Sequence, residues 1–491
     1  MPTYLVTTLI LAVSFASIGI AMVLAPTVES ADAANQRLTT GVTTTDIGSQ
    51  EQLGFDRIRK AGAKMTRVII YWSSVAPAAK PGSWNPTDPG DSHYSWAEFD
   101  SQLRMAVNAG LTPMVQIFSA PKWAERCKSS TAGICNPNPK AFARFSKAAA
   151  KRYSGTYGGL PRVRYWEPLN EPNLPLFFKP QYKNGKKVSP TLYRNLLNRF
   201  AGTVKGVKAG NKVIAGGLAP LERPGGLGPL DFARRVLCMT GRKHPKPERG
   251  CHDRARFDIW AVNPYTTGGP THESAGPDDV SLGDLPEMGK LLRAANSAGK
   301  IKTGQNSIPL WVTEFSWDSK PPDPGGVPMG LLTRWTSEAM FRAWQSGVSK
   351  FFWLSLRDWP SPKGLPYSET MESGLYFRGT TLAKDRPKRI LKAFHFPFVA
   401  FGKESGISVW GRTAASTGGK VALSFRTGGS WKRIGTAKAD RNGIFRSVIK
   451  TRLARKLGRK KRGDVRATYH GQTSRSFSLR PVKDRYQPPF G

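Results

Sequence analysis

Eight short apolar runs, separated by helical stretches, most constrain the fold of this chain. Each run is five to eight residues long and rich in β-branched, aliphatic and aromatic residues, as buried strands are. The runs span residues 38–45, 65–71, 112–118, 163–169, 212–217, 257–263, 309–313 and 350–354. An alternation of strands and helices predicts a parallel sheet covered by helices.

The segments between the runs carry apolar residues at helical spacing. Leu192, Leu196, Phe200 and Val204 form one such stripe between the fourth and fifth runs. Other helical segments are expected at 51–63, 139–154, 331–347 and 386–401. Together they predict an α/β fold, a (β/α)8 TIM barrel over residues 34–402. An open doubly wound sheet is the alternative, but no G-x-G-x-x-G fingerprint follows the first run.

Residues 403–491 have a different pattern. Six short segments alternate apolar and polar residues and are divided by turns, as where Val421, Leu423 and Phe425 share one face. This pattern predicts a small all-β sandwich of immunoglobulin-like type. We expect an accessory domain for attachment or support, without a catalytic cluster.

The same segment is strongly basic. It holds 22 Lys and Arg against 4 Asp and Glu, in a chain whose formal net charge is +40. Such a surface attracts polyanions, and nucleic acid is the usual partner inside cells. For an exported protein, an anionic polymer of the envelope or matrix is the expected partner. A solvated basic face without a specific partner is the alternative.

Residues 1–33 have the features of a targeting segment. Residues 4–25 carry no charge, and Ala31-Asp32-Ala33 offers a cleavage site of the A-x-A type. The run is also long enough to stay in a membrane as an anchor. We therefore expect a secreted or extracellular protein, with cleavage and surface anchoring both open.

Four cysteines fit an exported protein. Cys127 and Cys135 flank one short loop, and Cys238 and Cys251 flank another, so two local disulfides are predicted among three possible connectivities. A metal site is the alternative, but the six histidines lack the paired spacing of zinc sites. Neither a metal nor another cofactor is predicted.

Two predicted strands end in carboxylates. The fourth run continues into Asn170-Glu171-Pro172, and the seventh continues into Thr313-Glu314. In a parallel barrel the carboxyl ends of all strands open onto one face, where functional residues gather. Two carboxyl groups at one face are what the cleavage of a glycosidic bond requires. Each motif alone is weak evidence for this chemistry, whereas the two motifs together are much more specific.

On these residues the sequence resembles the retaining glycoside hydrolases of clan A, which include the family 5 and family 39 glycosidases. The resemblance covers roughly residues 38–400 and rests mainly on 166–173 and on Thr313-Glu314. It implies that Glu314 is the nucleophile and Glu171 the general acid/base. The implied activity is double displacement at an O-glycosidic bond of a β-linked poly- or oligosaccharide.

The chemistry makes different demands on the two carboxyl groups. Glu314 must be ionised to attack the anomeric carbon, whereas Glu171 must hold a proton for the leaving oxygen. The charge on Glu314 helps to raise the pKa of Glu171. After the glycosyl-enzyme forms, Glu171 becomes the base that activates water.

The resemblance also implies supporting residues. Arg67 is expected near the nucleophile, with an ordinary barrel salt bridge as the alternative. Asn170 is expected to bond the sugar 2-hydroxyl, a contact that strengthens in the transition state. Tyr265 is expected to donate a hydrogen bond to Glu314, with core packing as its alternative.

Three tryptophans are expected to bind sugar through their flat rings. By the resemblance Trp353 forms the floor of the sugar site, and Trp123 and Trp317 are platforms at its rim. Core packing is the alternative for each. The long loops 76–97 and 318–332, rich in Pro and Gly, are expected to shape the cleft.

The sequence departs from the clan's pattern in places. Leu169 stands where many relatives have Trp, and because Pro168 cannot donate to the ladder, the strand must bulge or lose a bond there. Asn263 stands where some relatives have His. Glu167 is a third carboxylate, expected to be a buried hydrogen-bonding partner. These departures leave the family and the sugar open.

Two other functions are weighed. One is a non-catalytic carbohydrate- or envelope-polyanion-binding protein on a glycosidase-like barrel. The other is a polyanion or nucleic-acid binder, whose affinity would fall steeply with salt and depend on residues 403–491. The presence of Glu171, Glu314 and Asn170 favours an enzyme.

Overall fold

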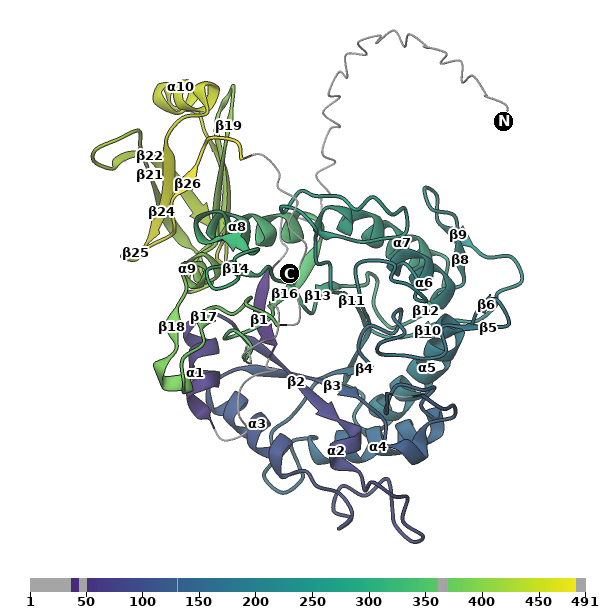
Figure 1. Cartoon of the computed structure of the whole chain (residues 1–491). Helices are drawn as coiled ribbons and strands as arrows, with labels where there is room; N and C mark the ends of the chain where they lie inside the picture. Colours follow the sequence, from purple (N-terminus) through teal and green to yellow (C-terminus); the bar gives the residue numbers. More distant parts are fainter. Residues whose placement is uncertain (1–36, 44–50, 130, 361–366, 368–369, 483–491) are drawn as a thin grey trace, which may run out of the picture.

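A closed barrel occupies the larger part of the molecule, and a smaller β-rich part lies at its side (Figure 1). The computed structural model describes residues 37–43, 51–129, 131–360, 367 and 370–482. The expected targeting segment, residues 1–33, lies outside the described residues. Among the helices of the described residues, none has both the length and the apolar character that crossing a bilayer requires.

Eight parallel strands form the barrel, in the spatial order β1-β16-β13-β11-β7-β4-β3-β2. The strands are β1 (Thr39–Thr43), β2 (Met65–Tyr71), β3 (Thr112–Phe118), β4 (Tyr165–Pro168), β7 (Lys212–Leu218), β11 (Ile259–Val262), β13 (Leu310–Val312) and β16 (Val348–Trp353). Each overlaps one of the eight predicted runs. The predicted (β/α)8 barrel is confirmed, and because the sheet closes on itself, the open doubly wound alternative is wrong.

Helices cover the outside of the barrel (Figure 1). They are α1 (Gln52–Lys60), α2 (Trp72–Val75), α3 (Ala97–Asn108), α4 (Pro139–Arg152), α5 (Ser189–Val207), α6 (Pro229–Val236), α7 (Leu285–Ser297), α8 (Met329–Gln345) and α9 (Arg389–His395). The start of α4 is fixed by a side-chain cap, because Asn138 accepts hydrogen bonds from the backbone N–H groups of Lys140 and Ala141. The helix expected over 386–401 is shorter, because Pro397 follows α9 and the chain then enters a strand.

The interior of the barrel is built in layers. An apolar layer contains Met65, Met114, Ile214, Ile259, Ala261, Trp311 and Phe352. Gly41 of β1 belongs to this arrangement, because a Cβ there would lie 2.4 Å from the ring of Phe352. Side chains alternate along a strand, so residues two positions further on form the next layer towards the carboxyl ends. That second layer is polar and carries the candidate site.

The β-rich part comprises two antiparallel sheets and one helix. One sheet contains β19 (Phe398–Lys403), β20 (Gly406–Arg412) and β23 (Ile444–Ile449). The other contains β21 (Gly419–Arg426), β22 (Lys432–Ala439), β24 (Asp464–Tyr469), β25 (Gln472–Thr473) and β26 (Phe477–Ser478). The predicted β domain after the barrel is confirmed. Its first strand, β19, begins before residue 403, and the basic run 450–462 contains helix α10 (Arg452–Lys460), which the sequence analysis did not predict.

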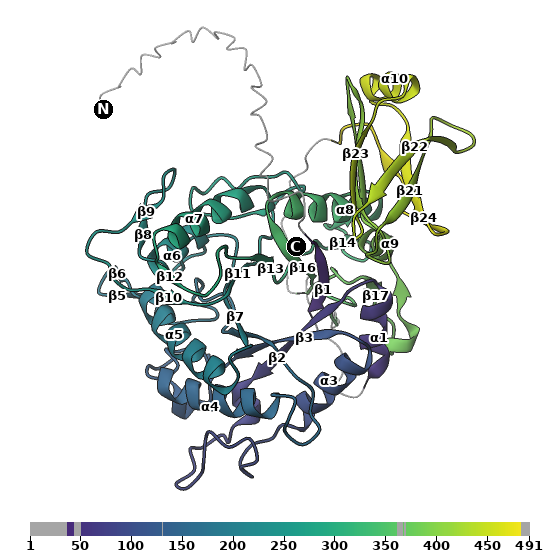
Figure 2. The ribbon, with the colours of Figure 1, turned by 180° about the vertical axis from the view of Figure 1, so that it is seen from behind.

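The β domain packs against α8 and α9 of the barrel, as both views show (Figures 1 and 2). Trp410 of β20 contacts the rings of Phe341 and Trp344 on α8, with centroids 5.5 and 5.6 Å apart. The buried guanidinium of Arg412 donates to the carbonyl of Leu38 at 3.2 Å. The two parts therefore share one apolar interface with a buried cation at its edge.

Short strand pairs and two disulfides fasten the loops. The pairs are β5 (Tyr182–Lys183) with β6 (Lys186–Lys187), β8 (Met239–Thr240) with β9 (Lys246–Pro247), β10 (Ala255–Arg256) with β12 (Ile301–Lys302), β14 (Ser319–Lys320) with β15 (Val327–Pro328), and β17 (Tyr376–Phe377) with β18 (Arg386–Pro387). Cys127 is bonded to Cys135, and Cys238 to Cys251, which confirms both predicted pairings.

Candidate active site

The polar layer of the barrel contains three side chains from β2, β3 and β4. Each lies two positions after a residue of the apolar layer, or after Tyr165, which packs against it, along its strand. Arg67 of β2, Gln116 of β3 and Glu167 of β4 are all buried. Oε2 of Glu167 is 3.1 Å from Nη2 of Arg67 and accepts from Nε2 of Gln116 at 3.0 Å. Glu167 is thus the buried hydrogen-bonding partner expected from its position, and it fixes the guanidinium of Arg67 in the lumen.

Arg67 joins the ends of the two motif strands. One guanidinium nitrogen, Nη1, forms an ion pair with Oε1 of Glu314, and the other, Nη2, donates to Oδ1 of Asn170 at 3.1 Å. The hydroxyl of Tyr265 donates to the second oxygen of Glu314 at 3.1 Å. Burial, followed by the charge of Glu314, raises the pKa of Tyr265, so this hydroxyl keeps its proton. Glu314 therefore sits between a cation and a donor, which suits an ionised carboxylate.

Glu171 has a different environment. It is buried, and its Oε1 accepts from Nδ2 of Asn263 at 2.9 Å. The orientation of that amide is fixed by Thr313, whose hydroxyl donates to Oδ1 of Asn263 at 2.9 Å. Burial, followed by the charge of Glu314, raises the pKa of Glu171 to about 8, although Asn263 and Arg67 act in the opposite direction. Glu171 is therefore suited to hold a proton near neutral pH.

The backbone at the end of β4 directs these side chains. The ladder from β4 to β7 stops at Trp166, before Pro168, as expected for a residue that cannot donate. Leu169 and Glu171 both adopt positive φ, at 64° and 37°. Such conformations are uncommon outside glycine and gather at functional sites. The N–H of Glu171 is satisfied by the carbonyl of Gly217 at 3.2 Å.

A cavity of about 670 Å³ opens above this layer, within the range of small-molecule sites. Among the predicted site residues, the cavity brings together Glu171, Glu314, Asn170 and Tyr265. Arg67 lies directly beneath, bonded to two of them. Five of the predicted positions are thus in one place, and the two carboxyl groups open onto the same space.

The three predicted tryptophan platforms are not part of this cavity. Trp353 is fully buried and its indole N–H donates to the carbonyl of Ser373 at 2.7 Å, while Leu354 lines the cavity instead. Trp317 is also fully buried and donates to the carbonyl of Gly268 at 3.0 Å. For these two residues the core-packing alternative holds, because the ring of Trp353 packs against Phe394 of α9 and that of Trp317, in the segment after β13, packs against Trp335 of α8.

Trp123 packs elsewhere on the surface. Its ring contacts Trp72 and Trp84 edge-on, both with centroids 5.8 Å apart. With Tyr94 these rings line a separate cavity of about 160 Å³. Loop 76–97, expected to shape the cleft, contributes Trp84 and Tyr94 to that second cavity. Neither this loop nor loop 318–332 lines the larger cavity within the described residues.

Other lining residues were missed by the sequence reasoning. Tyr71 at the end of β2 and Gln116 and Phe118 of β3 line the cavity, and Trp359 and Met371 reach it from the segment after β16. The loop after β4 adds residues 174–177. The sequence did offer one signal, since 174–177, LPLF, is an apolar stretch inside a loop between a strand end and a helix.

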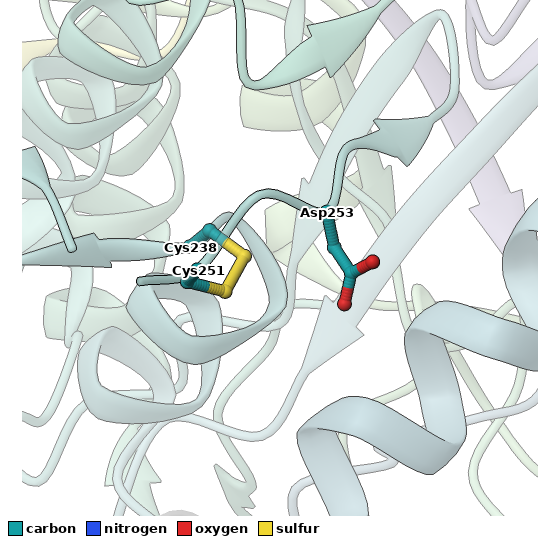
Figure 3. Close-up of side chains that lie close together, drawn as sticks. All are labelled: Cys238, Cys251 and Asp253. Carbon is teal, nitrogen blue, oxygen red and sulfur yellow. A yellow bond between two sulfur atoms is a disulfide. The ribbon is translucent and has the colours of Figure 1, made fainter. Parts of the chain in front are cut away.

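One group of side chains has a metal-like composition. Among the described residues, Cys238, Cys251 and Asp253 are the group whose ligand atoms lie within 4.8 Å of one another (Figure 3). Both sulfurs are joined in the disulfide, and the carboxylate of Asp253 pairs with Arg194. The thiolates that a metal would need are therefore consumed by the bridge.

Comparisons with known proteins add to this geometry. No protein-family model matches the sequence, and no curated protein sequence matches it. A family 39 glycoside hydrolase from Bacteroides cellulosilyticus WH2 is similar in structure, with a TM-score of 0.53 and 16% identity over 84% of this chain and 81% of that one. The chain shares its fold with family 39 glycoside hydrolases.

A second solved structure agrees with this assignment. A monomeric beta-xylosidase from Caulobacter crescentus CB15 has a TM-score of 0.51 and 15% identity, and the alignment covers 80% of this chain and 82% of that chain. Identities this low show a common fold and leave the sugar undetermined. The structural neighbours are thus glycoside hydrolases of clan A, the clan that the two strand-end motifs resemble.

Proposed function

We propose that the protein is an exported retaining β-glycosidase that hydrolyses an O-glycosidic bond of a β-linked glycan by double displacement. One observation carries the proposal. Glu314 and Glu171 open onto one cavity, and the first is held by a cation and a hydroxyl donor, whereas the second has a raised pKa. Two carboxyl groups in such different surroundings on one cavity are what double displacement at a glycosidic bond requires.

In the first step the Glu314 carboxylate attacks the anomeric carbon and Glu171 gives its proton to the leaving oxygen. The C–O bond breaks, and the aglycone departs as an alcohol. Arg67 orients the nucleophile and Asn170, while Asn170 is placed to bond the sugar 2-hydroxyl. Tyr265 stabilises the carboxylate oxygen that does not attack.

In the second step the roles of Glu171 reverse. Once Glu314 is esterified, its negative charge is gone, and the pKa of Glu171 falls because that charge was one of the causes of its rise. The ionised Glu171 then takes a proton from water, which attacks the anomeric carbon from the face that the aglycone left. The sugar is released with retained configuration, and both carboxyl groups return to their starting states.

Substitution of the two carboxyl groups tests the proposal. Glu314→Ala should abolish turnover of every glycoside that the wild type cleaves. Glu171→Ala should spare aryl glycosides with activated leaving groups far more than natural ones, because only the latter need protonation. Glu287→Ala, at an exposed position of α7, is the matched control and should retain activity. Equal activity of the wild type and Glu314→Ala would contradict the assignment.

Export is part of the proposal. The uncharged stretch 4–25 and two disulfides fit an oxidising compartment outside the cytoplasm. Localisation of a tagged full-length chain in its host, with mass analysis of the mature N-terminus, separates a cleaved leader from a retained anchor. A full-length chain recovered with reduced cysteines in the cytoplasm would contradict export.

We infer a second role for the basic domain, the binding of an anionic envelope or matrix polymer. The ends of β21, β24 and β26 meet and bring Arg426, Arg462 and Arg480 around a polar cavity of about 400 Å³. Asp464 is the acidic residue in this lining, and it lies 3.4 Å from Nε of Arg426. Arginine forks suit phosphate, sulfate and carboxylate groups.

The test of this role compares two triple variants of equal charge. Replacing Arg426, Arg462 and Arg480 by Ala should weaken retention on an immobilised sulfated glycan. Replacing Lys420, Lys438 and Arg441, which lie at the other end of the β21–β22 pair, is the control. Deleting 403–491 is less informative, because it removes part of β19 and uncovers Phe341 and Trp344. If both triple variants weakened retention equally, the binding would depend only on the overall positive charge, and the inferred site would be wrong.

A further inference from the structure

The cavity has a polar base and, above it, a chemically different wall. The barrel order places β3, β4 and β7 next to one another, so the loops after these strands surround Glu171 at the end of β4. Phe118 ends β3, residues 174–177 follow β4, and residues 219–221 follow β7, and all of them line the cavity. These lining residues, here called the apolar wall, are on the side where the proton donor must meet the leaving oxygen.

One side chain of the apolar wall is exposed to a degree that folding does not explain. Leu176 has 63% of its surface accessible. The rings of Phe118 and Phe177 lie 5.8 Å apart, and Tyr71 extends the series with its ring 6.3 Å from that of Phe118. A contiguous apolar patch that continues into a catalytic cavity is a ligand-binding surface.

The loop that carries this wall is held in place. The buried amide of Asn173 donates to the carbonyls of Ala219 and Leu227 at 3.2 and 3.0 Å and accepts from the N–H of Ala219 at 2.9 Å. The carbonyl of Glu171 accepts from the N–H of Leu174 at 2.9 Å. The exposed side chains therefore stand on a backbone tied to the loop after β7, and the wall is preformed for its ligand.

A second sugar would bind poorly to this wall. Sugar hydroxyls that leave water must find hydrogen-bond partners, or they lose free energy. The residues of the wall offer no polar side chain, and Arg223 is the polar residue next to them in the loop after β7. The base of the cavity, where Asn170, Gln116 and Tyr265 join the polar layer, holds the donors and acceptors that a sugar ring needs. The base and the wall divide the ligand into a polar glycone and an apolar leaving group.

We propose that the substrate is a glycoside whose leaving group is an apolar alcohol, with an alkyl or arylalkyl body that packs on the apolar wall. This inference rests on the proposed function and narrows it, since the bond cleaved then joins a sugar to an aglycone rather than to another sugar. The proton goes from Glu171 to the glycosidic oxygen, the C–O bond breaks, and Glu314 bonds to the anomeric carbon. The aglycone departs as an alcohol along the wall.

The experiment measures kcat/KM for a series of alkyl glycosides of the sugar that the enzyme turns over best. Unactivated alkyl leaving groups from ethyl to octyl differ little in acidity, so chain length isolates the apolar contact. The expected result is a rise of at least about twofold per methylene over several carbons, below the roughly fourfold limit for complete burial of a CH₂ group. A benzyl glycoside beside the hexyl glycoside shows whether rings or chains fit better.

Two variants locate the effect. Leu176→Ser and Leu53→Ser each remove an exposed leucine, the first from the wall and the second from α1. The octyl-to-ethyl ratio within each variant should fall for Leu176→Ser and stay at the wild-type value for Leu53→Ser, and the ratio cancels any general loss of active protein. A flat series, or faster cleavage of an oligosaccharide of the same sugar, would overturn the inference while the glycosidase function stood. No turnover of any glycoside would remove both.

Discussion

At the scale of single residues, the proposed mechanism makes Glu171 the group that sets the pH dependence of the reaction. Its pKa is raised to about 8, mainly by burial and then by the charge of Glu314. As the general acid it must be protonated, so kcat/KM should fall as the pH rises through about 8. A pH–rate profile checks this, and Glu171→Ala with a dinitrophenyl glycoside should lack the alkaline limb. If Glu171→Ala kept the same alkaline limb, that limb would report the titration of a group other than Glu171.

Asn263 tunes that pKa. Its amide donates to Glu171 at 2.9 Å, favours the ionised form and so lowers the pKa of Glu171. In Asn263→Ala the alkaline limb of the pH–rate profile should move to higher pH, and turnover should fall by about tenfold because the carboxyl is no longer oriented. Asn263→His keeps a donor and should restore part of both. An unshifted limb in the alanine variant would contradict this role.

At the scale of elements, the end of β7 supports the polar layer. Gly217 has φ of +58°, and a Cβ there would lie 2.8 Å from Oε1 of Glu167, the partner of Arg67. Gly217→Ala should therefore lose about 1–3 kcal/mol of unfolding free energy and also slow turnover. Urea titration measures the first effect.

A second glycine provides the matched control for that experiment. Gly206 lies in α5, and a Cβ there would contact nothing within 4 Å. Gly206→Ala should be neutral or slightly stabilising, because alanine favours helix. If Gly217→Ala were as stable as Gly206→Ala, the close approach at the end of β7 would carry no cost, and the account of this layer would be wrong.

The strands were predictable because buried parallel strands are apolar along most of their length. β2 and β3 coincide with their predicted runs at both ends. The ends of β4 and β13 were less predictable, because strand pairing stops where functional side chains turn inwards. Helix α10 was not predicted because the basic run 450–462, with eight Lys and Arg, contains only a short apolar stripe. Ala454 and Leu457 of that stripe are buried.

The candidate site was predictable where the chemistry dictates the residue. Glu171, Glu314, Arg67, Asn170 and Tyr265 lie together as their positions at strand ends suggested. The tryptophans were less predictable. Trp353 ends β16, where one residue of shift reverses the side that a ring faces, and Trp123 and Trp317 lie in segments after a strand, where no alternation indicates what a side chain faces. The apolar wall was missed because a loop carries no periodicity that reveals what its side chains face.

At the scale of the whole molecule, a buried acid outside the site affects stability. Asp318 is 2% exposed and lies near the carboxyl groups of Glu372 and Asp323. Burial, and then the charge of Glu372, raises its pKa from 3.8 to about 8. The folded state thus keeps a proton that the unfolded chain releases, so this group reduces the stability as the pH rises from about 4 to about 8.

Replacement of that acid tests the argument. Asp318→Asn cannot ionise, so its unfolding free energy should exceed that of the wild type by at least about 1 kcal/mol at pH 8. The difference should shrink towards pH 4, where both side chains are neutral. Thermal unfolding at several pH values measures it. A difference that does not change with pH would show that Asp318 has the same pKa in the folded and unfolded states, and would contradict this account.

The central claim is that Glu314 attacks the sugar and Glu171 delivers the proton across one cavity. A 2-deoxy-2-fluoro glycoside with a dinitrophenyl leaving group tests it most directly, because it forms the glycosyl-enzyme quickly and releases it slowly. Peptide mass spectrometry of the wild type should then find one sugar on Glu314 and none in Glu314→Gln. A label on Glu171 or Glu167, or turnover of the parent glycoside without any label, would contradict the account.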